Sequence, residues 1–190
     1  SITDPLGNVR TFTYDSTFNQ VHTSTDSLGQ VTGYTYDATG NLTSLTDPLG
    51  HTSTFSYNSF GQPVSASDAL GHTTTFEYDT VGNLTATVDP LGNRTERSYD
   101  PVSRLIAVRD PKGAVTRLAY DALDRLVSTT DALAGGASFT YDPNENLLTV
   151  TDAKGNTTTH EYDARNRLSK RTDPVGRTES LTYDFNGNLR

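Results

Sequence analysis

The chain has 190 residues, of which 33% are hydrophobic, and it contains no Trp, Met or Cys. The low aliphatic content excludes a thick globular core, and the absence of Cys excludes a disulfide framework and thiolate metal sites. Thr occurs 32 times and, together with Tyr, Phe and Val, favours strands over helices. We therefore expect a thin, all-β protein, and we find no apolar run long enough to span a membrane.

The net charge of −8 is unevenly distributed along the chain. Residues 1–93 contain nine acidic residues and one base, Arg10, whereas residues 94–190 contain 14 acidic and 14 basic residues. The first half should repel nucleic acid, and the second half has no basic run. We therefore expect no nucleic-acid partner.

Two series of residues recur every 21 residues. One is an Asp series that runs from Asp26 to Asp173, and the other is a Tyr followed by Asp or, once, by Asn. Only the first step of the Tyr series is 22 residues, which places one extra residue near Asn19. The members are Tyr14 and Asp15, Tyr36 and Asp37, Tyr57 and Asn58, Tyr78 and Asp79, Tyr99 and Asp100, Tyr120 and Asp121, Tyr141 and Asp142, Tyr162 and Asp163, and Tyr183 and Asp184. Such a period is typical of repeat architectures, and we predict a single array of about nine repeats over residues 1–190, cut within a repeat at both ends.

Each repeat contains two turn signals. The first reads Asp-Pro-Leu-Gly, as in residues 47–50, and the second reads Asp-x-x-Gly, as in residues 37–40. Asp at the first position, Pro at the second and Gly at the fourth are the preferences of a type I turn. In four later copies the second Gly is replaced, by Ser103, Asp124, Glu145 and Asn166. Either these turns depend less on positive φ or they tolerate strain.

Strands are predicted between the turns. Residues 52–57 alternate, with Phe55 and Tyr57 on one face and hydroxyl residues on the other, which is typical of a half-buried strand. The segment after the second turn opens with an aliphatic residue, such as Leu42 or Leu84. Each repeat is therefore predicted to form a β-hairpin. Nine hairpins would give about eighteen strands in a continuous antiparallel sheet that must curve or spiral.

The Tyr-Asp pair followed by x-x-Gly-Asn-Leu, as in residues 36–42, or by x-x-x-Arg-Leu, as in residues 120–126, resembles the RHS/YD-repeat family. This resemblance covers essentially the whole chain and implies a β-sheet ribbon that spirals into a hollow shell. In bacterial insecticidal and polymorphic toxins such shells enclose a toxic domain, and in teneurins a related shell supports cell adhesion. Those shells use many more than nine repeats, so we do not expect this segment to enclose a cargo alone.

The resemblance implies a non-catalytic wall segment of a secreted or cell-surface bacterial protein. Its expected partners are neighbouring repeats, further copies of itself and an enclosed toxin domain. Two alternatives stay open. The Tyr and Phe face could bind a glycan or a cell-surface partner, or the open sheet edges could pair into an extracellular fibre.

No residue is predicted to be catalytic or to bind a cofactor or metal. Turn chemistry accounts for most carboxylates, and Ca²⁺ bound by stacked turn carboxylates is the alternative interpretation. His51 and His72 lie at equivalent repeat positions, roughly 10 Å apart, which is too far to share a metal easily. We expect His22 and His160 also to be surface or edge residues. Residues 173–176 match the letters at which toxin-bearing family members cleave themselves, but the same letters recur as ordinary turns, so we expect no autoproteolysis.

Overall fold

The computed structural model describes residues 1–190 and is all-β, with eighteen strands. The chain divides into two compact units, residues 1–95 and 96–190, and the boundary falls inside β10 (Arg94–Tyr99). None of its segments is a helix capable of crossing a membrane. The first unit contains β1 (Ile2–Thr3), β2 (Val9–Tyr14), β3 (Val21–Thr25), β4 (Val31–Tyr36), β5 (Leu42–Thr46), β6 (Thr52–Tyr57), β7 (Pro63–Ser67), β8 (Thr73–Tyr78) and β9 (Leu84–Val88). The second contains β11 (Leu105–Arg109), β12 (Val115–Tyr120), β13 (Leu126–Thr130), β14 (Gly136–Tyr141), β15 (Leu147–Asp152), β16 (Thr157–Tyr162), β17 (Leu168–Thr172) and β18 (Thr178–Ser180).

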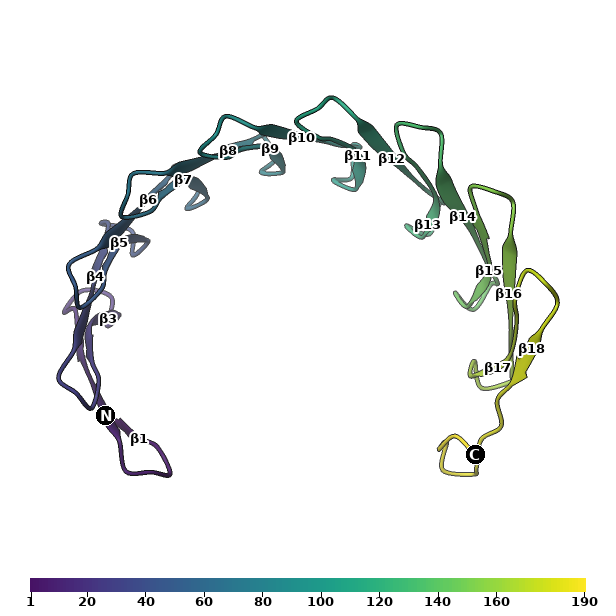
Figure 1. Ribbon diagram of the computed structural model, residues 1–190, viewed down its shortest axis with the longest axis horizontal. Helices are drawn as coiled ribbons and strands as arrows, with labels where there is room; N and C mark the ends of the chain where they lie inside the picture. Colours follow the sequence, from purple (N-terminus) through teal and green to yellow (C-terminus); the bar gives the residue numbers. More distant parts are fainter. The chain divides into compact units, whose positions relative to one another are not determined.

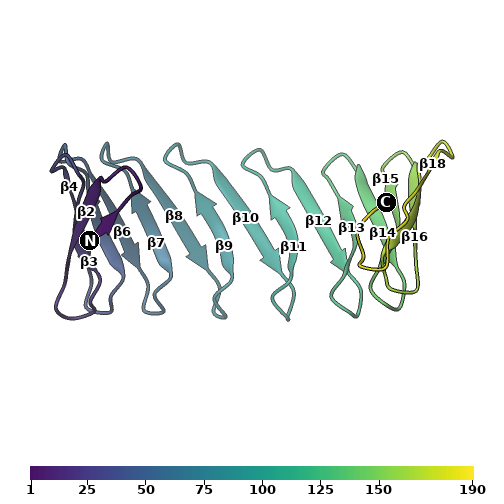
Figure 2. The ribbon, with the colours of Figure 1, turned by 90° about the horizontal axis from the view of Figure 1, so that it is seen from below.

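Within each unit every strand pairs antiparallel with the strand that follows it in sequence, as β6 does with β7 and β14 with β15. Figure 1 shows that the sheet of each unit is bent, and Figure 2 shows strands that run between two rows of turns. The predicted all-β, antiparallel and curved sheet is confirmed. The prediction of one array over residues 1–190 stays a prediction, although both units use the same repeat.

The two hairpins of a repeat differ in register. Hairpins that turn at the Tyr-Asp sequence contain a β-bulge on the strand that follows the turn: Ser56 pairs with Ser65 and Tyr57 with Pro63, so that Val64 is the extra residue. Hairpins that turn at the Asp-Pro-Leu-Gly sequence have a regular register, as between Thr46 and Thr52. A bulge bends its strand and increases the local twist. Because the bulge recurs at the same place in each repeat, the bend accumulates within a unit.

Each unit is a single layer with almost no core. Ala86 and Ser24 are the only buried residues. In β6, Phe55 and Tyr57 are half-buried while Thr54 and Ser56 are exposed, which confirms the predicted alternation. With so little interior, the stability of a repeat must come from its neighbours along the sheet.

The hydroxyl face of the sheet is held together by pairs of side chains across neighbouring strands. Ser56 Oγ lies 2.6 Å from Ser65 Oγ, and Thr140 Oγ1 lies 2.6 Å from Thr149 Oγ1. Cross-strand hydroxyl pairs of this kind stabilise one pairing register over its alternatives. The abundance of Thr and Ser in the sequence therefore has a structural explanation.

The φ angles of the turns answer a question that the sequence left open. Ser103, Asp124, Glu145 and Asn166 all have positive φ, between 57° and 70°. These turns keep the left-handed conformation without Gly, at the cost of a close approach between Cβ and the following carbonyl oxygen. The interpretation that they depend less on positive φ is wrong, and the one that they tolerate strain is right.

The extra residue of the first repeat lies where the spacing predicted it. The N–H of Asp15 donates to the carbonyl of Gln20, one residue further along the chain than in the other turns. Asn19 takes the positive-φ position of this longer turn, with φ of 53°. A single insertion is thus absorbed in the loop, and the strands on either side keep their pairing.

Candidate functional site

The Asp at the start of each turn binds the turn's own backbone. Asp47 Oδ1 accepts hydrogen bonds from the N–H groups of Leu49 and His51, at 2.8 and 2.9 Å. Its Oδ2 lies 2.8 Å from His51 Nδ1. The Tyr-Asp turns repeat this arrangement, as in Asp79 with Val81 and Asn83. The carboxylate oxygens are therefore occupied by the turn itself.

These contacts favour the ionised carboxylate. The Arg167 side chain, followed by the Arg167 backbone N–H, lowers the pKa of Asp163 to about 2. Hydrogen bonds from the side chains of Asn41 and Thr39 hold the pKa of Asp37 well below its usual range. No three His, Asp or Glu side chains come together in an arrangement that could hold a metal ion. The turn carboxylates thus serve the fold.

Three of the four histidines, His22, His51 and His72, are exposed, and His160 is not. His51 and His72 are exposed, and each lies 2.8 Å from the Asp of its own turn. His160 is half-buried in β16, where it pairs with Arg171, and its Nδ1 has no partner. The expectation of a surface or edge position is wrong for His160. The reason is that it takes the half-buried strand position that Phe139 takes one repeat earlier.

The repeated Tyr attaches its repeat to the preceding one. In six repeats the Tyr hydroxyl donates to a backbone carbonyl oxygen fifteen residues earlier. That carbonyl belongs to the first residue of the strand that follows the previous Tyr-Asp turn. The pairs are Tyr36 with Val21, Tyr78 with Pro63, Tyr120 with Leu105, Tyr141 with Leu126, Tyr162 with Leu147, and Tyr183 with Leu168, at 2.8 to 3.0 Å. Burial raises the pKa of Tyr36, which keeps this hydroxyl protonated as a donor. The sequence carries no signal for this bond, because an offset of fifteen residues is not a periodicity of the repeat.

A second link runs forward in three repeats, from the residue that follows the Tyr-Asp turn to a backbone carbonyl of the next such turn. Gln62 Nε2 donates to the carbonyl of Gly82 at 2.9 Å, and Arg125 Nη1 donates to the carbonyl of Asp142 at 2.9 Å. The Arg125 guanidinium also lies 4.7 Å from the centroid of the Tyr141 ring, a cation–π contact. In these repeats a Tyr hydroxyl and a long polar side chain both link one repeat to the next.

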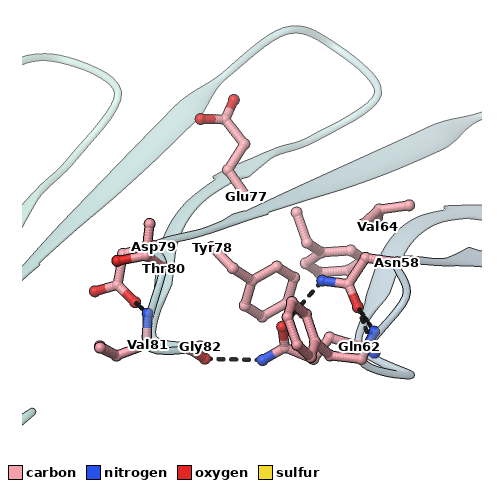
Figure 3. Close-up of a pocket in the computed structure, with 11 residues that line it drawn as sticks. Asn58, Gln62, Val64, Glu77, Tyr78, Asp79, Thr80, Val81 and Gly82 are labelled. Atoms are coloured by element: carbon pink, nitrogen blue, oxygen red, sulfur yellow. Dashed lines mark hydrogen bonds between the residues drawn. The ribbon is translucent and has the colours of Figure 1, made fainter.

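The Tyr-Asp turns of the first unit leave an open hollow between two successive repeats. It has a volume of about 730 Å³ and is lined by Phe60, Gln62, Phe76, Tyr78 and Val81 among others. Figure 3 shows Gln62 reaching the turn that ends at Gly82, beside the ring of Tyr78. Phe60 and Val81 are 84% and 75% exposed, so the hollow presents apolar side chains to solvent. This hollow is the candidate binding site of the first unit.

An equivalent hollow lies two repeats earlier. It has a volume of about 550 Å³ and is lined by Phe18, Tyr34, Tyr36 and Ala38 among others. Tyr36 and Phe18 correspond to Tyr78 and Phe60 in the repeat. The hollow is thus a product of the repeat, and sequence reasoning identified its tyrosines while missing the exposed Phe60 and Val81.

The fold is shared with structures of TcdB2–TccC3. The structure of TcdB2–TccC3 without its hypervariable C-terminal region superimposes with a TM-score of 0.67 over 95% of this chain, at 18% sequence identity. A second TcdB2–TccC3 structure gives a TM-score of 0.66 over 96% of this chain, at 13% identity. The chain spans 12% and 14% of the length of those two proteins. A comparison with curated proteins finds no significant match.

The RHS Repeat family model matches four consecutive stretches, residues 16–52, 57–95, 99–138 and 141–178. These stretches contain most of the Tyr-Asp turns, the Tyr hydroxyl bonds and both hollows described above. The family resemblance read from the Tyr-Asp pattern is confirmed, and the chain belongs to the RHS repeat family.

Proposed function

We propose that this chain is a non-catalytic wall segment of a secreted bacterial shell protein, in which a longer RHS array encloses or presents a toxin or other effector domain. The observation that supports this proposal most directly is the link between successive repeats. Six of the repeated Tyr hydroxyls bind the repeat before their own, and side chains such as Gln62 and Arg125 bind the repeat after it. A sheet that is stabilised along its length, with almost no interior, is suited to forming a wall.

The same contacts argue for a spatial rather than a chemical role. Most of the acidic residues are the first Asp of a turn, and their carboxylates are bound to backbone N–H groups of their own turns, as Asp79 is, rather than free to act as acid or base. The structural similarity to the TcdB2–TccC3 shell supports the wall function at the level of the fold.

The test uses the natural polypeptide that contains this array. Electron microscopy is expected to show a hollow particle. Limited proteolysis is expected to leave an enclosed segment uncut, and this segment should become sensitive to the protease when the wall is opened. To open it, Tyr141→Phe and Tyr162→Phe would remove two inter-repeat bonds, and Tyr57→Phe would serve as the matched control, since Tyr57 makes no such bond. A solid or extended particle with no protected segment would contradict the proposal.

A glycan-binding function is the second candidate, and the hollow at Phe60, Phe76 and Tyr78 is the observation that favours it. Aromatic rings with nearby amides, such as those of Asn58 and Gln62, are suited to stacking on a sugar ring and bonding its hydroxyls. Binding on a glycan array that is lost in Phe60→Ser but kept in Thr54→Ala would support this function. If the unchanged chain binds no glycan, this function is excluded.

A further inference from the structure

A row of exposed leucines marks one edge of the first unit. Leu6, Leu28, Leu49, Leu70 and Leu91 occupy the third position of successive Asp-x-Leu-Gly turns, and each is between 81% and 88% exposed. We call this row the leucine rim. Single exposed leucines are common on protein surfaces, but five at one repeat position form a regular apolar surface. Apolar surface of this regularity indicates an interaction partner.

The opposite edge of the same unit, where the Tyr-Asp turns lie, we call the tyrosine rim. It carries the hollow lined by Phe60, Tyr78 and Val81 and the equivalent hollow lined by Phe18 and Tyr36. Both hollows are open, and their aromatic and aliphatic walls leave apolar surface uncovered. One edge of the unit therefore presents apolar projections and the other presents apolar depressions.

The spacing of the projections matches that of the depressions. The two hollows are 42 residues apart, from Tyr36 to Tyr78, and so are Leu28 and Leu70. A separation of four strands is roughly 19 Å along the sheet. We propose that the leucine rim of one copy of this chain docks on the tyrosine rim of a second copy, with alternate leucines inserted into the hollows.

The period argues for a second copy as the partner, and the charges argue against an anionic membrane. An Asp begins every turn of the leucine rim, as Asp47 and Asp68 do beside Leu49 and Leu70, and residues 1–93 carry a net charge of −8. Such a surface is repelled by anionic lipid headgroups. A globular partner without the 21-residue period could contact only one or two leucines, whereas another array of this repeat contacts the whole row.

This contact would join different surfaces of the two copies. A head-to-tail contact leaves one free rim at each end, so it adds further copies and forms an open stack. A single row of leucines buries less than the ~1,200–2,000 Å² of a standard protein interface, so the affinity should be micromolar or weaker. Because both rims are acidic, added salt should screen their repulsion and strengthen the association. The inference goes beyond the wall function, because it assigns a partner to each rim of the first unit.

The test is sedimentation velocity of the 190-residue chain from about 10 to about 500 µM, at low and high salt. The unchanged chain should form a concentration-dependent series of species. L28S/L49S/L70S removes the three central leucines of the rim, and F18S/F60S/V81S removes apolar walls of both hollows. The first variant should fold, because Lys112 and Lys154 occupy the same turn position in the second unit. Circular dichroism verifies the fold of both variants, and T54A/T75A, on the exposed sheet face, is the matched control.

Each rim variant alone should sediment as a monomer, and an equimolar mixture of the two should form a dimer, because each keeps the rim that the other lacks. The control should associate like the unchanged chain. Association of F18S/F60S/V81S alone would overturn the proposal in favour of leucine-to-leucine packing. A monomeric unchanged chain at the highest concentration, or association that salt weakens, would also overturn it. So would leucine-dependent binding to phosphatidylcholine–phosphatidylserine vesicles in place of self-association.

Discussion

The hydroxyl of Tyr141 donates a 2.8 Å hydrogen bond to the carbonyl oxygen of Leu126, fifteen residues earlier in the chain. Leu126 opens the strand that follows the previous Tyr-Asp turn, so the bond joins two repeats. The same ring lies under the guanidinium of Arg125. One Tyr thus fixes the position of its repeat against the preceding one through both its hydroxyl and its ring, and several predictions about stability depend on this arrangement.

Removing the hydroxyl alone should destabilise the chain. Tyr141→Phe leaves the Leu126 carbonyl without its donor, and we expect a loss of about 1 kcal/mol in the free energy of unfolding. Tyr57→Phe is the matched control, because Tyr57 holds the same repeat position without this bond, and its loss should be much smaller. Urea unfolding monitored by circular dichroism measures both values. Equal losses in the two variants would show that the hydroxyl bond contributes nothing specific.

Restoring Gly at a strained turn should stabilise the chain. Glu145 is exposed and has φ of 70°, and its side chain forms no hydrogen bond. We expect Glu145→Gly to raise the free energy of unfolding by about 0.5–1 kcal/mol, because Gly adopts this conformation without a Cβ clash. Gly50→Ala is the reverse test. Its φ is 85° and an added Cβ would meet nothing within 4 Å, so a loss of about 1 kcal/mol would report backbone strain alone. A decrease in Tm for Glu145→Gly would contradict this account.

The contribution to stability of the forward link, from the residue after a Tyr-Asp turn to the next turn, should be measurable at Arg125. Arg125→Asn copies the natural residue Asn146, which still bonds the Asp of its own turn. The variant loses the cation–π contact with Tyr141 and the bond to the Asp142 carbonyl. We expect a loss of about 1–2 kcal/mol by chemical denaturation. Arg117→Asn, on an exposed position of β12, is the control and should change stability little. If both variants behave alike, the forward link is not a source of stability.

Acid should lower the stability of the fold over a pH range that is set by the pKa values of the turn carboxylates. The pKa of Asp163 falls from 3.8 to about 2 in the folded chain, because Arg167 donates to the carboxylate. A folded-state pKa below the unfolded value contributes stability above about pH 4, and the contribution disappears as the pH falls from about 4 to about 2. Asp163→Asn should flatten the dependence of stability on pH in this window.

The turn should survive this substitution, because Asn58 makes the equivalent backbone bonds in its own turn. Thermal unfolding at a series of pH values between about 2 and 6 provides the measurement. Glu145→Gln, which removes a carboxylate that accepts no hydrogen bond, is the control. An unchanged pH profile for Asp163→Asn would mean that this carboxylate is not linked to folding.

Much of the fold could be predicted from the sequence, because it depends on local chemistry. The 21-residue period, the Asp-Pro-Leu-Gly turns and the alternation of Phe55 and Tyr57 with hydroxyl residues specify hairpins without reference to distant contacts. The insertion near Asn19 was located from spacing alone. The family followed from the same repeated letters, since Tyr-Asp, Gly and Leu recur at fixed offsets.

The candidate site was predicted less completely. The Tyr series was identified as structural, but the partners of its hydroxyls were not, and neither Phe60 nor Val81 was singled out. Whether Ser103 and Glu145 take positive φ could not be decided either, because side-chain type gives only a preference for that conformation.

The sequence by itself determined the repeat, its two turns and the faces of its strands, because each depends on residues a few positions apart. Only the tertiary structure decided which atoms of successive repeats meet. The regular pairing of β13 with β14 brings the Tyr141 hydroxyl to the Leu126 carbonyl, and the Arg125 side chain reaches the Asp142 carbonyl. The hollows and the leucine rim follow from the same cause, since they are made by side chains of neighbouring hairpins whose relative positions are set by strand pairing.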